Sequence, residues 1–89
     1  MAVRDGLTYT YHLNRLAGTL SNGVPTLDAQ GAANIWAGTK GFAIPGALNA
    51  LYASRNGGNN LGLDLQGVLN ALAGTKGLGI NEAAAEIVS

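Results

Sequence analysis

Apolar residues recur at spacings of three and four positions in five short segments of the chain. In the segment 62–75, Leu65, Val68, Leu69 and Leu72 would share one side of a helix. The stripes expected in the other four segments are Tyr9, His12, Leu13 and Leu16; Ala29, Ala32, Ala33 and Trp36; Ile44, Ala47, Leu48 and Leu51; and Ile80, Ala83, Ala84 and Ile87. Helices of about ten residues are marginal in isolation, so we expect the five stripes to share one core.

The five segments are copies of one repeat, with the template G-L-x-x-x-x-x-L-N-x-L-A-G-T. The copies are Gly6–Thr19, Thr26–Thr39, Gly41–Ser54, Gly62–Thr75 and Gly77–Ser89. Their starts lie 20, 15, 21 and 15 residues apart, because extra residues follow the first and third copies, as LSNGVP (20–25) and RNGGNN (55–60). The sequence therefore predicts one all-α domain over residues 1–89, a compact array of about five short helices paired into units of about 35 residues, with an N-terminal arm (1–6) and an inter-pair loop (55–60).

Cap residues mark the ends of the expected helices. Asp28 and Asp64 are good N-caps, and Thr8 is a weaker one. Pro45 falls in a first turn, where its missing N–H costs nothing. A glycine in the left-handed conformation closes three of the helices. These glycine stops are Gly18, Gly38 and Gly74.

One polar column runs through the repeat. Asn14, Asn34, Asn49 and Asn70 occupy the same template position, about 140° around the helix from the start of the apolar stripe. We expect each amide to bond to backbone groups of an adjoining unit. A ligand-binding role and simple solvent exposure are the alternatives.

Three glycines stand three residues before these asparagines. They are Gly31, Gly46 and Gly67. Glycine inside a helix costs about 1 kcal/mol relative to alanine, so its recurrence at one position needs a cause. The close approach of another backbone is the expected one.

The segment LTYTYHL admits two interpretations. Alternation of Thr8, Tyr9, Thr10 and Tyr11 is typical of a short β-strand, which would be free to pair with a neighbouring chain. The repeat alignment instead places Thr8 at a helix cap, and we favour the helix.

Candidate chemistry is sparse. The single histidine, His12, falls on a core position, Asp28 and Asp64 are explained as caps, and the chain has no cysteine. Glu82 and Glu86 form an i, i+4 pair, read most simply as a solvated face. We therefore expect no catalytic, cofactor-binding or metal-binding residues, and no enzyme activity.

Two glycine-containing phrases superficially resemble nucleotide-binding motifs. AGTKG (37–41 and 73–77) lacks the Gly-x-x-x-x-Gly-Lys-Ser/Thr order of a phosphate loop. GLGIN (77–81) is too short a fragment of a dinucleotide fingerprint. Trp36 replaces a leucine of the template beside three alanines, so we assign it to the core rather than to a ligand platform.

The charge balance narrows the classes of partner. Five basic and five acidic residues cancel, and only 11% of residues are charged. No basic stripe points to nucleic acid, no apolar run is long enough to span a membrane, and no secretory signal opens the chain. Such a charge-poor surface reflects either ordinary variation or coverage by partner subunits.

The repeated phrases resemble those of short repeat-containing virion proteins from tailed phages that infect actinobacteria. LNRLAGT (13–19), ANIWAGTKG (33–41) and LNALAGTKGLGINEAAAEIVS (69–89) bear the resemblance, which extends over Gly6–Ser89. The resemblance implies a particle component and no catalytic residues. It implies a capsid decoration or minor capsid protein, with a minor tail or fibre-associated binding module as the alternative. A free helical adaptor outside any particle is the alternative to a virion role.

The expected partners are the phage major capsid protein, other virion subunits or further copies of the chain itself. The expected location is the virion, on the capsid surface rather than the tail, after synthesis in the host cytoplasm. The candidate contact residues are Arg4 and Tyr9 near the N-terminus, and Arg55, Asn56, Asn59 and Asn60 in the inter-pair loop. The same loop has the alternative role of a simple linker.

Overall fold

Residues 7–88, which the computed structural model describes, form five helices and one short hairpin. The helices are α1 (Tyr9–Ala17), α2 (Ala29–Ala37), α3 (Ile44–Arg55), α4 (Leu65–Ala73) and α5 (Ile80–Val88), and the strands are β1 (Leu20–Ser21) and β2 (Val24–Pro25). The prediction of a compact, mostly helical array of five short helices is confirmed. The N-terminal arm (1–6), including Arg4, lies outside the described residues.

The helix ends follow the cap chemistry of the repeat. The Oδ1 atoms of Asp28 and Asp64 accept hydrogen bonds from the backbone N–H groups of Gly31 and Gly67, both at 2.7 Å. The expected glycine stops have φ between 73° and 76°, the left-handed region that glycine adopts without strain. These stops are Gly18, Gly38 and Gly74. Thr8 precedes α1 in an extended conformation without a side-chain cap bond.

The tyrosine-rich segment is helical. α1 begins at Tyr9, so the helix interpretation of residues 8–11 is confirmed and the strand alternative is wrong. The alternation of threonine and tyrosine is overridden by packing, because His12 and Leu13 must both face the other helices.

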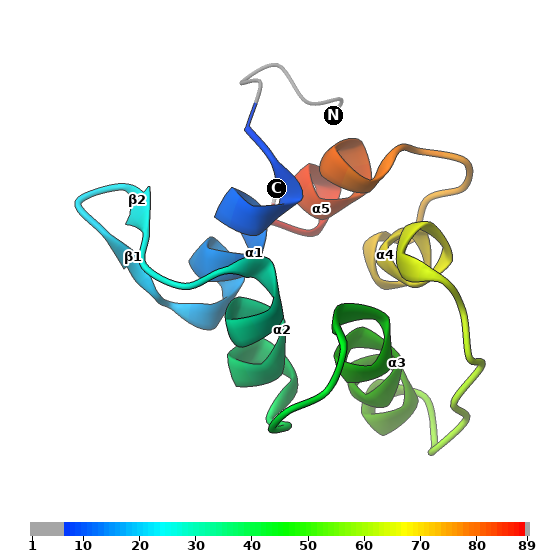
Figure 1. Cartoon of the computed structure of the whole chain (residues 1–89). Coiled ribbons are helices and arrows are strands. Elements are labelled where there is room, and N and C mark those ends of the chain that lie inside the picture. The colour runs from blue at the N-terminus through cyan, green and yellow to red at the C-terminus, as the bar shows by residue number, and fades with distance from the viewer. Residues whose placement is uncertain (1–6, 89) are drawn as a thin grey trace.

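The five helices form a closed ring (Figure 1). Each helix packs against the next along the chain, and α5 packs against α1 to complete the circle. The molecule is accordingly flat, with principal extents of 35, 28 and 17 Å. Because the ring is closed, each of its helices has a neighbour on both sides. In an open repeat array, by contrast, the terminal units have one side without a neighbour.

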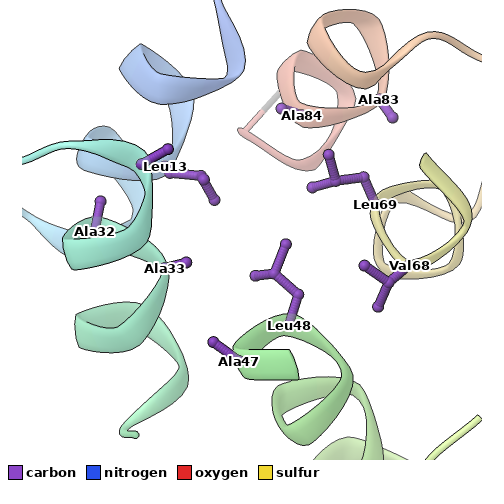
Figure 2. Close-up of a cluster of buried hydrophobic side chains, with 10 residues drawn as sticks. Leu13, Ala32, Ala33, Ala47, Leu48, Val68, Leu69, Ala83 and Ala84 are labelled. Carbon is purple, nitrogen blue, oxygen red and sulfur yellow. The ribbon is translucent and has the colours of Figure 1, made fainter. Parts of the chain in front are cut away.

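The core occupies the middle of this ring. Figure 2 shows Leu13, Leu48 and Leu69 pointing inward from three different helices. All three are fully buried, as is Val68 beside Leu69. α2 and α5 contribute only alanines to the same cluster: Ala29, Ala32, Ala33, Ala83 and Ala84. The core is therefore small, and three leucines fill most of its centre.

The two extra segments have different structures. Residues 20–25 make the β1–β2 hairpin, whose turn residues Asn22 and Gly23 have φ of 51° and 76°. Two successive positive φ values are typical of a type I′ turn, for which Asn-Gly is a strong signal. After the third copy, α3 continues to Arg55, so the first residue of the expected 55–60 loop belongs to the helix.

Candidate functional site

The repeated phrase builds a hydrogen-bonded joint between consecutive helices. At the junction of α4 and α5, Asn70 Nδ2 donates to the carbonyl oxygens of Gln66 and Leu78, both at 2.9 Å. Its Oδ1 accepts from the Leu78 N–H at 3.1 Å and from the Thr75 hydroxyl at 2.7 Å. Asn70 thus uses both amide protons and accepts two bonds, the full capacity of its side chain. We call this arrangement, in all its copies, the asparagine joint.

Two other asparagine joints repeat this geometry. Each has four bonds of 2.6–3.2 Å, made to the residue four positions back, to the residue just outside the next helix cap, and to a threonine. The sets are Asn14 with Thr10, Leu27 and Thr19, and Asn34 with Gln30, Phe42 and Thr39. The amides therefore bind the adjoining unit, as the sequence predicts for this column.

The remaining asparagine joint, at Asn49, lacks the threonine bond. Asn49 donates to the Pro45 and Leu63 carbonyls at 2.8 Å and accepts from the Leu63 N–H at 3.0 Å. Ser54 occupies the threonine position, but its hydroxyl donates to the Leu51 carbonyl instead. The cause is the longer α3, because Ser54 is still helical there and cannot turn back toward Asn49.

Burial explains why these positions demand an amide. The four joint asparagines are at most 8% exposed, although they lie off the apolar stripe. The loop entering the next helix covers them. That loop brings a backbone N–H and C=O with it, and buried backbone groups require partners. An asparagine satisfies both groups of one residue at once.

The threonine of each AGT phrase is a functional part that the sequence analysis missed. Thr75 donates its N–H to the Asn70 carbonyl at 3.0 Å, which closes α4 after the left-handed Gly74. Its hydroxyl then fixes the Asn70 amide. The signal was present, because a threonine follows the asparagine by five residues in three copies.

Ring closure between α5 and α1 uses a different residue. Asn81 Oδ1 accepts from the Tyr9 N–H at 2.7 Å, across the two ends of the described chain. Asn81 stands in the template position of Gln30 and Gln66, whose side-chain amides donate to a carbonyl in the entry loop of the next helix, whereas Asn81 accepts. Ala85 takes the joint-asparagine position in α5.

The glycines three residues before the asparagines have a different cause from the one predicted. A Cβ on Gly67 would lie 2.9 Å from Asp64 Oδ1 and 3.3 Å from Leu63 Cβ, and Gly31 is hemmed in likewise by Asp28 and Leu27. The close neighbour is the cap of the same helix and not another backbone, so that prediction was wrong. Because glycine has no Cβ, the cap carboxylate has room to approach the backbone N–H group from which it accepts a hydrogen bond.

Gly46 differs, because the N-cap residue of α3 is Ala43 and not an aspartate. A Cβ there would make an ordinary 3.5 Å contact with Phe42 Cδ2. We expect Gly46→Ala to raise the free energy of unfolding by about 0.5–1 kcal/mol through helix propensity.

The matched variant Gly67→Ala should give no such gain. Its Cβ displaces the Asp64 carboxylate, and a lost N-cap costs about 1 kcal/mol. Urea unfolding of both variants measures the difference. Equal stabilisation by the two substitutions would contradict the cap explanation.

The candidate contact residues are not gathered in one place. Tyr9 begins α1, is partly buried against the core, and its N–H binds Asn81. α1 contacts α2 and α5 but neither α3 nor α4, which flank the 55–60 loop. Arg4 lies outside the described residues.

The end of α3 and the loop after it hold the other four candidates. Asn56 caps α3, and its Nδ2 donates to the Tyr52 carbonyl at 2.8 Å. Asn60 Oδ1 accepts from the Gly62 N–H at 3.0 Å. Asn59 is exposed, and Arg55 places its guanidinium 5.4 Å from the ring centroid of Trp36. Arg55 therefore joins α3 to α2 through a cation–π contact.

His12 and Trp36, which the sequence analysis assigned to the core, are buried and partly buried respectively. His12 is 2% exposed, and its ring meets the Tyr11 ring edge-on at a centroid distance of 5.4 Å. Trp36 is partly buried and packs against the core cluster. Within residues 7–88 there is no group of three or more His, Cys, Asp or Glu side chains arranged to hold a metal ion.

Among residues 7–88, four large apolar side chains are 44–60% exposed. They are Val24 in the hairpin, Ile35 on α2, Phe42 before α3 and Leu61 before α4. No helix in the described part of the chain is both long and apolar enough to cross a bilayer. Comparisons with protein-family models, with curated proteins and with solved structures gave no match.

Proposed function

We propose that the protein is a non-enzymatic structural component of a tailed-phage particle, a capsid decoration or minor capsid protein that binds the shell in many copies. One observation supports this most directly. The phrase that resembles the phage virion proteins is the phrase that forms the asparagine joint, with its Asn, Gly and Thr all engaged inside the chain. The feature that this chain shares with those phage proteins is therefore the joint that holds its helices in a rigid, compact module.

Because the joints use the recurring polar groups of each repeat copy within the chain itself, we assign partner binding to exposed side chains that the joints do not use. Val24, Ile35, Phe42 and Leu61 offer apolar contact area on a chain with balanced charge. Exposed apolar side chains on a chain with few charges suit a protein partner better than a phosphate backbone, to which clustered lysine and arginine would bind. The partner that we propose is the major capsid protein or a neighbouring virion subunit.

Purified virions test this proposal directly. We expect this chain among the proteins of density-purified particles, in a copy number comparable with that of the major capsid protein. Complete absence from the particles would contradict a virion role and favour the free adaptor. Imaging of the particles at side-chain resolution then separates shell from tail, and density for the ring on the tail alone would favour the minor tail module.

A pair of charge substitutions tests the contact surface. Ile35 and Ala71 occupy the same template position on α2 and α4, but only Ile35 is a large exposed apolar residue. We expect Ile35→Asp to lower incorporation into particles several-fold, and Ala71→Asp to leave it nearly unchanged. Circular dichroism of both variants checks that the ring remains folded.

A further inference from the structure

Two Asn-Gly dipeptides occur in the chain, at Asn22–Gly23 and Asn56–Gly57. Such dipeptides are chemically labile, because glycine has no side chain to hinder attack by its backbone nitrogen on the preceding amide. Sequence alone gives both sites the same reactivity. The structure separates them through the hydrogen bonds and exposure of each asparagine.

Asn56 is held by the end of α3. Its Nδ2 donates to the Tyr52 carbonyl at 2.8 Å, and its N–H donates to the Ala53 carbonyl at 3.1 Å. The N–H of Gly58, two residues on, donates to the same Ala53 carbonyl at 2.7 Å. The amide of Asn56 therefore points back along the helix, away from the nitrogen of Gly57.

Asn22 has no comparable restraint. It is exposed at the tip of the hairpin, and its side chain makes no hydrogen bond within residues 7–88. Apart from Gly23 and its two chain neighbours, no residue comes within 4 Å of the Cβ position of Gly23, and residues 21–24 are all exposed. The strands below it pair over only two residue pairs, Leu20 with Pro25 and Ser21 with Val24. So short a ladder opens at little cost, which releases the turn for other conformations.

We propose that Asn22 is the site at which this protein undergoes spontaneous deamidation. The Gly23 backbone nitrogen attacks Cγ of Asn22, a C–N bond forms, and the side-chain nitrogen leaves as ammonia. Water then opens the five-membered imide at either carbonyl, which gives aspartate or isoaspartate. Each event adds one negative charge to a chain whose formal net charge is zero. Isoaspartate also inserts an extra carbon into the backbone of a two-residue turn, which breaks the pairing of β1 with β2.

The test is incubation of the full-length folded protein in mildly alkaline buffer, followed by tryptic mapping. Cleavage after Arg15, Lys40, Arg55 and Lys76 places Asn22 and Asn56 in separate peptides, 16–40 and 56–76. We expect acidic and isoaspartyl forms of the first peptide to accumulate several-fold faster than those of the second. A parallel incubation in concentrated urea should bring the two rates close together, because the unfolded dipeptides are alike.

Two variants complete the experiment. Asn22→Gln should remove most of the acidic species seen on isoelectric focusing, since the six-membered imide forms far more slowly. Asn56→Gln should leave that species in place. Equal or faster reaction at Asn56 in the folded protein would overturn the assignment. So would reaction of both sites in urea with protection of both in the folded state, because the turn would then shield Asn22.

Discussion

Asn14→Ala should lower the free energy of unfolding by about 3 kcal/mol, out of the 5–15 kcal/mol typical of a small domain. Asn14 is fully buried and makes four hydrogen bonds, two of them to the N–H and C=O of Leu27. Alanine removes these bonds and leaves the two Leu27 backbone groups in place, whereas the Thr19 hydroxyl keeps its bond to the Asn14 carbonyl oxygen at 3.3 Å. Each buried polar group left without a partner costs about 1–3 kcal/mol, partly recovered where water enters.

Asn14→Asp distinguishes hydrogen bonding from size. A carboxylate fills the same volume but cannot donate to the Thr10 and Leu27 carbonyls, so we expect a loss at least as large as that of alanine. Asn59→Ala is the matched control, since Asn59 is exposed in the loop after α3 and should change stability by less than about 0.5 kcal/mol. Urea unfolding followed by the fluorescence of Trp36, the single tryptophan, gives all three values. A loss below about 1 kcal/mol for both Asn14 variants would show that the asparagine joint contributes little.

The helices and their ends were predictable because each is specified locally. The spacing of Leu65, Val68, Leu69 and Leu72 defines one helix, and Asp64 and Gly74 define where it begins and ends. The asparagine column was predictable because four copies repeat it. The role of Thr75 was not, since its hydroxyl becomes meaningful only when the chain turns back on itself after Gly74.

Closure of the ring could not be predicted from the sequence, because it depends on the geometry of all the joints together. The repeat specifies how each helix meets the next, but whether five units return to their start depends on the rotation accumulated over all the joints. The Asn81 bond to Tyr9 exists only as a result of that rotation. The hairpin is the opposite case, because its signal, Asn22-Gly23 between Ser21 and Val24, was present in the sequence but was treated as an insertion.

Closure of the ring also determines how much unfolding free energy is lost when a core side chain is truncated. Leu48→Ala should lower the free energy of unfolding by about 4 kcal/mol, near the upper end of the 2–5 kcal/mol range for buried leucines. Leu48 is fully buried and points, with Leu13 and Leu69, into the centre of the ring, where the buried apolar residues of α2 and α5 are all alanines (Figure 2). The cost of such a cavity falls when neighbours move in to fill it. Here the asparagine joints and the α5–α1 contact hold every helix from both sides, so little inward movement is available.

Two further variants make this prediction specific. Leu48→Met conserves volume and should cost less than about 1.5 kcal/mol. Leu61→Ala removes the same atoms from a side chain that is 55% exposed, and should change stability by less than about 0.5 kcal/mol. If Leu48→Ala instead lost under about 2 kcal/mol, the helices would have to be closing over the vacancy, and the ring would be more deformable than its joints imply. A rigid ring predicts the full loss, because a structure that presents fixed surfaces to its neighbours cannot also relax around a missing leucine.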